Sequence, residues 1–507
     1  MTTQQPLANA FDARKAFFAH RASAVYPLRI RPHSDLCVVF MNYWLLKNDI
    51  PQVGVNFRAY DSHGSLRARR SLDAVALHNE LSVREYLLRP SGAELPFDGM
   101  LEVEIVSTSN LAFPFPAILG VYEANGFFSA VHAAGRIKNP DEPKNPQRSE
   151  EANWTCVFER DGAGYSVVPF FHYFVGATPV PVGEAIEVRL RDRAGVVVDS
   201  KTLAIGGMLP FASRVFFADE IFALAQTPAE GSFMSVALRG YDVFPRLVVG
   251  NFHRTSDFLE VTHSFPISEF ADYCPQPGPS APANSVPSLL AAQVARGLQL
   301  SVRVFPTNCA GRVQTLVNRK AFDDKRLRAV GERFEFDSGV ESDGLSFELG
   351  PEEELRVLHL HGDAIPSRLN ASYRYRVAGV PRRFSTDIAT GAKSIVYPPK
   401  RRHWGHGRVG GGFDTYVLFR NNTHSPDSTA AKTGEIRILG GGIDRVTRFD
   451  VAAESCVALR LSEVLEIDPA VRSPTFVSWL MSMANPVGET FWVAFRPDGA
   501  VFGEHGF

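Results

Sequence analysis

The sequence predicts a mainly all-β protein made of tandem antiparallel β-sandwich units that are joined by short helices. The main observation is a loose repeat of about 130 residues along the chain. Phe97–His132 and Ala229–Phe265 each contain an alternating strand, a Phe-Pro step, a Gly-Val-Tyr or Gly-Asn-Phe run, and a last strand that reaches a histidine. A second observation is the high phenylalanine content, 38 residues. Phenylalanine suits the half-buried surface of a pleated sheet.

Length and charge narrow the class of protein further. A chain of 507 residues is too long for one core, so several domains are expected. The formal net charge of −2 comes from 53 basic and 55 acidic residues. Nucleic-acid binding through phosphates requires a basic surface, so we expect no nucleic-acid partner.

The cysteines and the hydrophobic runs indicate an intracellular location. The five cysteines are far apart and form no CxxC pair, which argues against a disulfide framework and a zinc knuckle. No signal-peptide core is seen at the N-terminus, and no apolar run has the length of a transmembrane helix. We therefore expect a cytoplasmic protein without a membrane span.

Two strands with the same turn chemistry support the repeat. Val53–Tyr60 alternates apolar and polar residues and is followed by Asp61-Ser-His-Gly64. Ile186–Arg191 shows the same alternation and is followed by Asp192-Arg-Ala-Gly195. Period two predicts a strand with one buried face, and Asp and Gly at these positions favour a type I turn. The units resemble immunoglobulin-like or jelly-roll-like sandwiches, a likeness of fold that does not determine function.

Short helical turns are predicted after Ser82, at Asp219 and Glu220, and at Ser462 and Glu463, where polar residues suit a helix N-terminus. Two linkers, Asn139–Glu151 and Pro275–Pro287, are too polar or proline-rich to fold alone. The predicted organisation is an N-terminal arm (1–24), unit 1 (25–138), a connecting segment (139–165), unit 2 (166–274), a Pro-rich linker (275–290), a diverged unit 3 (291–407) and unit 4 (408–507).

Histidines recur at the ends of the predicted units. They are His132, His263, His403 or His406, and His505. Repeated imidazoles at equivalent positions are a candidate set for a metal ion or a common ligand group. The alternative is that each ring fills the end of its own sandwich and donates to a loop carbonyl, because one histidine per unit lacks the three or four converging ligands that a metal requires.

His359 and His361 form the sharpest local chelate. Residues two apart on a strand point to the same side, so both rings could reach one zinc or iron ion. The alternative is an exposed strand edge with two solvated histidines.

Two further groups of residues are candidate ligand sites. Arg402, His403, Trp404 and His406 combine positive charge, imidazoles and an aromatic ring that suits an anion or a sugar, although the glycines that follow also fit a simple joint. His253 and Arg254 with His263 place donors on or near a loop of the second unit, where a solvated hairpin tip is the alternative.

Aromatic residues near strand ends suggest platforms for sugars or for a neighbouring subunit. They are Tyr43, Trp44, Tyr122, Phe127, Phe128, Tyr173, Phe252, Trp404, Trp479 and Trp492. No Gly-x-Ser-x-Gly, HExxH or strand-to-helix GxGxxG motif occurs, and this favours a protein without catalysis.

The leading hypothesis is a multi-domain β-sandwich binding or assembly protein without a cofactor. Its partner would be a bacterial polysaccharide, another protein, or a second copy of the chain in a homo-oligomer. One alternative is a zinc- or iron-dependent enzyme with a histidine-based site between units, and another is a viral or cell-surface structural component.

Overall fold

The computed structural model confirms an all-β tandem fold with short helices. It describes residues 18–507 except for 74, 112–114, 140–141, 143–151, 161–165, 193–195, 223–230, 238–241, 245, 267–284, 289–291, 305–311, 319–330, 338–345, 351–353, 356, 362–367, 381–385, 394–401, 421–430, 453–455 and 484–489. No helix in these residues combines the length and the apolar character that crossing a membrane requires. Residues 1–17 of the predicted N-terminal arm lie outside the described residues.

The first unit packs two four-stranded antiparallel sheets against each other. One sheet has the order β1-β6-β3-β4, and the other has the order β5-β2-β7-β8. The strands are β1 (Arg21–Ile30), β2 (Ser34–Met41), β3 (Gly54–Asp61), β4 (Leu66–Leu72), β5 (His78–Ser82), β6 (Phe97–Val106), β7 (Leu119–Ala124) and β8 (Phe127–His132). Its short helices are α2 (Tyr43–Asn48), η1 (Arg84–Leu88) and η2 (Arg89–Ser91).

The second unit repeats this topology strand for strand. Its sheets are β13-β12-β15-β9, extended by β18, and β14-β11-β16-β17, extended by β10. The elements are β9 (Ala152–Val157), β10 (Glu159–Arg160), β11 (Ser166–Phe174), β12 (Ala185–Arg191), β13 (Val197–Ala204), β14 (Ser213–Phe217), α3 (Ala218–Phe222), β15 (Phe233–Ala237), β16 (Val248–His253), β17 (Phe258–His263) and β18 (Phe265–Pro266).

The third unit has the same order again, with sheets β19-β26-β22-β23 and β24-β21-β27-β28 and a small β20-β25 pair. Its strands are β19 (Ser285–Ser288), β20 (Ala292–Gln293), β21 (Leu298–Val304), β22 (Arg312–Asn318), β23 (Gly331–Asp337), β24 (Ser346–Leu349), β25 (Glu354–Leu355), β26 (Val357–His361), β27 (Arg368–Val377) and β28 (Thr386–Lys393).

The fourth unit completes the series with sheets β29-β34-β31-β32 and β33-β30-β35-β36. Its elements are β29 (Arg402–Val409), β30 (Asp414–Arg420), β31 (Lys432–Gly440), β32 (Ile443–Val451), β33 (Cys456–Arg460), α4 (Leu461–Leu465), β34 (Thr475–Met483), β35 (Thr490–Phe495) and β36 (Val501–His505). In all four units the last strand of the second sheet (β8, β17, β28 or β36) is therefore at the edge of that sheet.

The first strand of each unit begins earlier than the sequence indicated. β9 lies inside the predicted connecting segment 139–165, and β19 lies inside the predicted Pro-rich linker 275–290. β29 begins at Arg402, before the predicted start of unit 4. These strands are short or flanked by turn-forming residues, and β19 contains Pro287, which an edge strand tolerates.

Local sequence signals in the first unit are confirmed. β3 alternates buried and partly exposed residues, as period two predicts. The Asp61 carboxylate accepts from the backbone N–H of His63 at 3.0 Å, and Gly64 has a φ of 90°. The Ser82 hydroxyl accepts from the backbone N–H of Glu85, the second residue of η1, at 3.0 Å.

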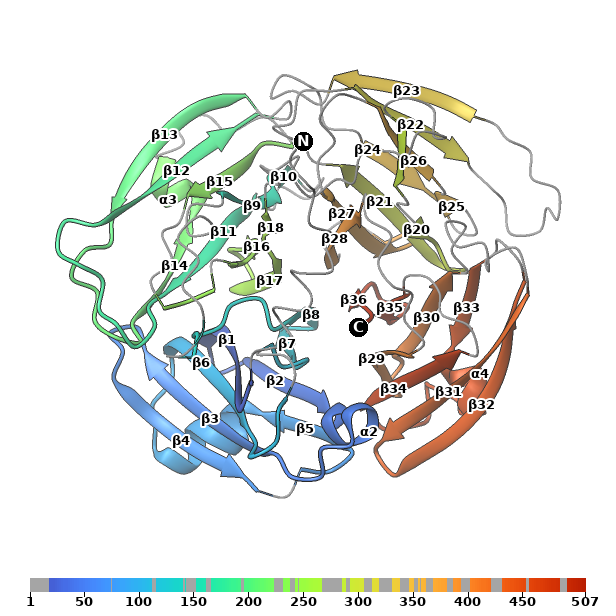
Figure 1. Ribbon diagram of the computed structural model, residues 1–507, viewed down its shortest axis with the longest axis horizontal. Helices are drawn as coiled ribbons and strands as arrows, with labels where there is room; N and C mark the ends of the chain where they lie inside the picture. Colours follow the sequence, from blue (N-terminus) through green and yellow to red (C-terminus); the bar gives the residue numbers. More distant parts are fainter. Residues whose placement is uncertain are drawn as a thin grey trace, which may run out of the picture.

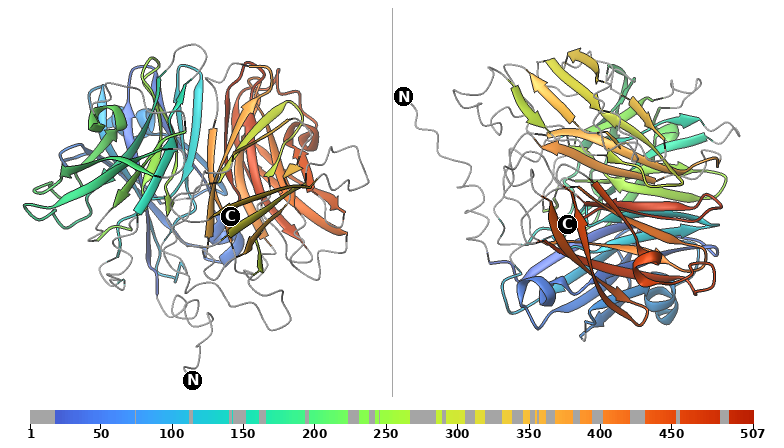
Figure 2. Two further views of the ribbon diagram at one scale, coloured as in Figure 1. Left: turned by 90° about the horizontal axis from the view of Figure 1, so that it is seen from above. Right: turned by 90° about the vertical axis from the view of Figure 1, so that its right-hand side faces the viewer.

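The four units form a closed ring around a central axis (Figure 1). The last strands of the units lie at its centre, where β8 contacts β17, β17 contacts β28, β28 contacts β36, and β36 contacts β8. Two side views show that the units lie side by side and form one body, instead of following one another like beads (Figure 2).

Hydrogen bonds connect neighbouring units at this axis. The Ser129 hydroxyl of β8 accepts from the backbone N–H of Val261 in β17 at 2.7 Å. The Thr262 hydroxyl of β17 accepts from the backbone N–H of Ala389 in β28 at 3.2 Å. The Glu504 carboxylate of β36 accepts from the backbone N–H of His132 in β8 at 3.3 Å. Polar backbone groups at the centre are thus paired across unit boundaries, which joins the ring into one body.

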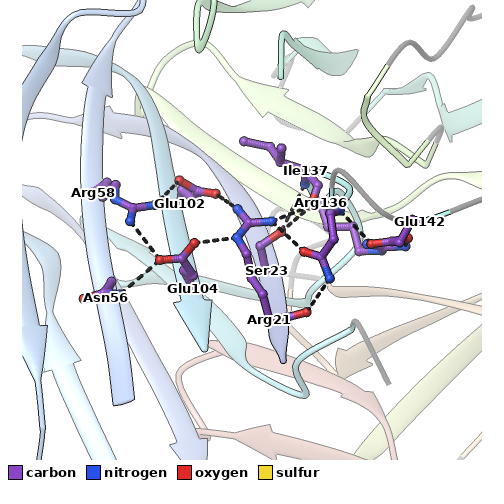
Figure 3. A network of polar contacts seen from close by, with 10 residues as sticks. Arg21, Ser23, Asn56, Arg58, Glu102, Glu104, Arg136, Ile137 and Glu142 are labelled. Atoms are coloured by element: carbon purple, nitrogen blue, oxygen red, sulfur yellow. Dashed lines mark hydrogen bonds and ion pairs between the residues drawn. The ribbon is translucent and has the colours of Figure 1, made fainter. Parts of the chain in front are cut away.

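A buried ion-pair network stiffens the first sheet of unit 1 (Figure 3). Glu102 and Glu104 on β6 are each paired with both Arg21 of β1 and Arg58 of β3, at distances of 2.5 to 3.0 Å. Burial raises the pKa of Glu102 despite both arginines. In Glu104 burial is outweighed by the hydrogen bond and charge of Arg21, the charge of Arg58 and the hydrogen bond from Asn56 together, and its pKa is lowered. Two carboxylates held by two guanidiniums form a structural network, not an acid–base pair.

Removing one arginine tests the role of this network. We expect Arg21→Ala to lower the free energy of unfolding by about 3–5 kcal/mol, because it leaves buried carboxylates without one of their cations. The matched control is Arg189→Ala, which removes an exposed pair with Glu187 and is expected to cost less than about 1 kcal/mol. Denaturant titration measures both, and equal effects of the two substitutions would contradict the structural role.

Candidate metal centre

Three of the four predicted terminal histidines meet at the axis of the ring. His132 ends β8, His263 ends β17, and His505 ends β36. Their positions correspond, because His132 pairs with Leu119, His263 with Val248 and His505 with Phe491 near the start of the preceding strand. The repeated topology therefore brings the same position of three units to one place. β28 of unit 3 contains no histidine.

The three rings and one carboxylate are close enough to share an ion. The ring centroid of His132 lies 4.9 Å from that of His263 and 4.6 Å from that of His505. One ligand atom from each of these histidines and from Glu504 lies within 4.8 Å of the others. Tetrahedral ligands at about 2.0–2.1 Å from zinc are roughly 3.3 Å apart, so binding requires the side chains to move inward by about 1 Å.

The Nδ1 atoms of the three histidines are already engaged. Nδ1 of His132 lies 3.1 Å from the Glu504 carboxylate, Nδ1 of His263 lies 3.0 Å from the Ser264 carbonyl, and Nδ1 of His505 lies 3.1 Å from the Gly506 carbonyl. Carboxylates and carbonyls accept only, so each Nδ1 carries the proton and donates. Each Nε2 therefore carries the lone pair. Metal-binding histidines are typically held in this way, with the other ring nitrogen donating to a carboxylate or a carbonyl.

Electrostatics keep at least two of the rings neutral. Burial, together with the charge of Arg246, lowers the pKa of His263 well below its ordinary value. Burial lowers the pKa of His505 to about 3, although Glu504 opposes it. Burial also raises the pKa of Glu504. Neutral imidazoles are the protonation state that a metal requires, so these two rings need not lose a proton when an ion binds.

A guanidinium lies against the cluster. Nη2 of Arg246 is 2.9 Å from Nδ1 and 3.0 Å from Nε2 of His263. Because Nη2 is nearly equidistant from the two ring nitrogens, it lies over the face of the His263 ring and not on the lone-pair axis of either nitrogen. The side chain of His505 is 27% exposed, whereas that of Glu504 is 1% exposed. The centre is therefore open toward solvent on the His505 side.

The structure places three of the four residues of the predicted ligand site around Trp404 in the core. His403, Trp404 and His406 lie on β29, the first strand of unit 4 instead of the last strand of unit 3, and all three are buried. Trp404 stacks on Tyr43 of unit 1 with centroids 5.0 Å apart. Only Arg402 of this group is exposed, and it donates to the Leu46 carbonyl.

The predicted site of His253, Arg254 and His263 is not one site. His253 and His263 lie at opposite ends of the β16–β17 hairpin, since His253 pairs with Phe258 and His263 with Val248. The buried His253 ring is 2.9 Å from the Glu260 carboxylate. The exposed Arg254 pairs with Asp219. Only His263 belongs to the axial centre.

The predicted chelate of His359 and His361 stays a prediction. Both residues lie on β26, so the expected strand is present, and β26 is interior to its sheet between β19 and β22. Their side chains lie outside the described residues.

The aromatic residues proposed as platforms are buried, with Phe127 alone partly exposed. Trp44, Trp479 and Trp492 each have 0% exposure. These buried rings therefore offer no exposed face for the stacking on sugars that the sequence suggested.

Two members of the axial centre were missed by sequence reasoning. Glu504 directly precedes the terminal His505, and this adjacency was the available signal. Arg246 lies just before β16, and no local pattern connects it to residues 263 and 505. Only the folded ring brings it there.

No protein-family model matches the chain, and no curated protein matches it. Among solved structures, the native conformation of Escherichia coli alpha-2-macroglobulin is similar over 93% of this chain and 28% of that chain, with 10% sequence identity and a TM-score of 0.10. This chain thus spans well under two thirds of that protein, and so low a score supports no argument about fold or function.

The partly buried His78 and the buried His406, at the boundary of units 1 and 4, make the protein sensitive to acid. The Ser478 hydroxyl lies 2.8 Å from Nδ1 of His78 and 3.0 Å from Nδ1 of His406. Burial lowers the pKa of His78 from 6.5 to about 4 and that of His406 to about 3. The unfolded chain binds these protons more readily, so their contribution to stability is complete above pH 6.5 and is lost as the pH falls toward the folded values.

We expect the free energy of unfolding to fall by on the order of 3 kcal/mol for each ring between pH 7 and pH 4. Denaturant titrations at a series of pH values measure this loss. The variant His78→Gln should lose less stability across that range than the wild type. The exposed His63→Gln is the control and should follow the wild type. If the free energy of unfolding of His78→Gln changed with pH as it does in the wild type, protonation of this ring would not be the cause of the loss of stability.

Proposed function

We propose that this chain is a β-sandwich binding protein that holds a divalent transition metal ion on the axis of its ring. The all-β, multi-sheet fold is consistent with a β-sandwich binding or structural protein. The observation that carries the proposal is the meeting of His132, His263 and His505 with Glu504.

Donor chemistry supports a transition metal. Imidazole nitrogens suit zinc, copper, iron and nickel, whereas magnesium and calcium prefer oxygen ligands. Three histidines supply three Nε2 lone pairs, and Glu504 either orients His132 or adds an oxygen. Zinc and iron are the two ions suggested by the sequence, and both bind three histidines with or without a carboxylate.

The position of the centre gives the metal a structural role. Its ligands come from units 1, 2 and 4, so one ion connects three units that are otherwise joined by packing and hydrogen bonds. A metal that binds only the folded ring stabilises it by mass action, by about 2.7 kcal/mol at a hundredfold excess over the Kd.

Metal binding is tested on purified, untagged protein that is stripped of metal with a chelator, incubated with Zn²⁺ or Co²⁺, and dialysed to remove unbound ions. We expect one Zn²⁺ or Co²⁺ per chain by elemental analysis, and a higher midpoint of thermal unfolding in its presence. His505→Ala should lose at least tenfold in affinity because it removes one of three imidazoles. The control, His63→Ala, changes an exposed turn histidine and should retain full binding. Less than 0.1 ion per wild-type chain would exclude the proposal.

Self-association through β13 is a second candidate function, favoured by an exposed apolar edge. β13 is the edge strand of its sheet, and Val198 on it is 56% exposed. Exposed apolar strand edges are typical pairing sites. If two copies pair antiparallel about Ser200, each Asp199 faces Lys201 of the other copy, an arrangement of opposite charges.

Sedimentation at increasing protein concentration measures this association. We expect a dimer for the wild type and a monomer for Val198→Lys, because a charge replaces an apolar side chain at the edge. Val471→Lys is the control, since Val471 is 83% exposed and lies elsewhere, in unit 4. A wild-type protein that stays monomeric at all concentrations would rule the candidate out.

A further inference from the structure

The boundary between units 4 and 1 differs from the other boundaries because no connecting segment crosses it. Units 1 and 2, 2 and 3, and 3 and 4 follow one another along the chain, whereas units 4 and 1 are neighbours only in the ring (Figure 1). Here β5 contacts β31 and β34, and β2 contacts β34. Between units 2 and 3, by contrast, the buried Arg374 also pairs with Glu260 at 3.2 Å. The ring can therefore open between units 4 and 1 while each unit keeps its fold.

One serine serves two imidazoles from opposite sides of this boundary. Oγ of Ser478 lies 2.8 Å from Nδ1 of His78 in unit 1 and 3.0 Å from Nδ1 of His406 in unit 4. The hydroxyl has one proton, so with both rings neutral it donates to one Nδ1 and accepts from the other. The His78 ring also lies against the backbone of unit 4, since a Cβ on Gly440 would be 3.1 Å from its Nε2.

A proton added to either ring has no partner while the boundary is closed. Within the described residues, Nε2 of His78 and Nε2 of His406 have no hydrogen-bond partner. An imidazolium carries an N–H donor on both ring nitrogens, so a buried N–H would stay unpaired. Burial lowers the pKa of His78 to about 4, and burial with the charge of His78 lowers that of His406 to about 3. In an open ring, water solvates both rings and their pKa values return toward 6.5, so acid favours the open form.

Two carboxyl groups on these faces oppose the histidines. Burial raises the pKa of Glu80, whose carboxylate accepts from the backbone N–H of Phe476 across the boundary. Burial also raises the pKa of Asp35 on β2. A carboxyl whose pKa is raised binds its proton more tightly in the closed form, so both reduce the effect of acid around their own values. The histidines act over the range from pH 6.5 down to about 4 and about 3.

The other charged groups on the two faces do not change this direction. Among the described residues they are Glu123 of β7, Arg402 and Arg408 of β29, and Glu435 and Arg437 of β31. Arginines stay charged over this whole range. At the axial end, beside His132 and Glu504, burial lowers the pKa of His505 to about 3, so this ring acts in the same direction as His78 and His406.

We propose that acid opens the ring at the boundary between units 4 and 1, with His78, Ser478 and His406 as the proton sensor, and leaves the four sandwiches folded. The open form is an arc of four units. Between pH 7 and pH 4.5 each of the two rings raises the ratio of open to closed form by roughly fiftyfold, and the two carboxyls offset part of this. The inference does not depend on the proposed metal site.

Two native cysteines of the full chain report on two different boundaries. Cys37 on β2 packs with apolar residues of units 1 and 4, and the buried Cys156 on β9 lies beside Asp387 of unit 3. Their modification by 4,4′-dithiodipyridine, which reacts with thiols in acid, is followed by peptide mass spectrometry with a chelator present. Each rate is divided by that of the denaturant-unfolded chain at the same pH. From pH 7 to pH 4.5 we expect a rise on the order of a hundredfold for Cys37, with Cys156 still protected.

A matched pair of variants identifies the sensor. In His78→Gln the amide can still bond to Ser478 but takes up no proton, so the rise for Cys37 should be at least tenfold smaller. His63→Gln, in an exposed turn, should follow the wild type. Small-angle X-ray scattering of the wild type at pH 4.5 should give a larger radius of gyration, with the far-ultraviolet circular dichroism unchanged.

Three results would overturn the inference. The first is that Cys37 and Cys156 become reactive together as the circular dichroism signal is lost, which is global unfolding. The second is a Cys37 rate that does not change with pH. The third is a folded His78→Gln protein that opens like the wild type. If His78→Gln does not fold, the contrast between Cys37 and Cys156 in the wild type, together with the scattering, decides.

Discussion

The burial of the last strand of each unit is the constraint on which the rest of the structure depends. β8, β17 and β36 are buried along nearly their whole length, on the face toward their own unit and on the face toward the axis. The core of one sandwich covers only one face of such a strand, so the other apolar face has to be covered by a neighbouring unit. Each unit therefore needs its neighbours, and a closed ring meets this need for all four at once.

The axial centre follows from this arrangement together with the repeat. Since the units share one topology, an equivalent position in each unit faces the same point, and a histidine retained there in three units produces a cluster without any local motif. Glu504 and Arg246 then make the three positions unequal. Glu504 is within hydrogen-bond distance of His132, and Arg246 of His263, so the chemistry of the centre is less symmetric than its backbone.

The sequence was sufficient for the fold class because strand alternation and turn chemistry are local. The alternation in β3 and the Asp61 turn report on neighbouring residues, and both are present as expected. Alternation does not reveal which unit lies opposite a buried face. His403 and His406 were therefore assigned to the end of a unit, although β29 begins one. The recurring terminal histidines were recognised, but their convergence depends on long-range ring closure, as does the approach of Arg246.

The order of the ligands along the chain has a consequence for biosynthesis. Units 1 and 2 emerge from the ribosome first and carry His132 and His263, but Glu504 and His505 lie on the last strand. If each sandwich folds as it emerges, its inner strand stays exposed until the fourth unit docks between the third and the first. During translation that exposed surface is a place for chaperones or for misassembly between nascent chains, and the proposed ligand set is complete only once β36 has emerged.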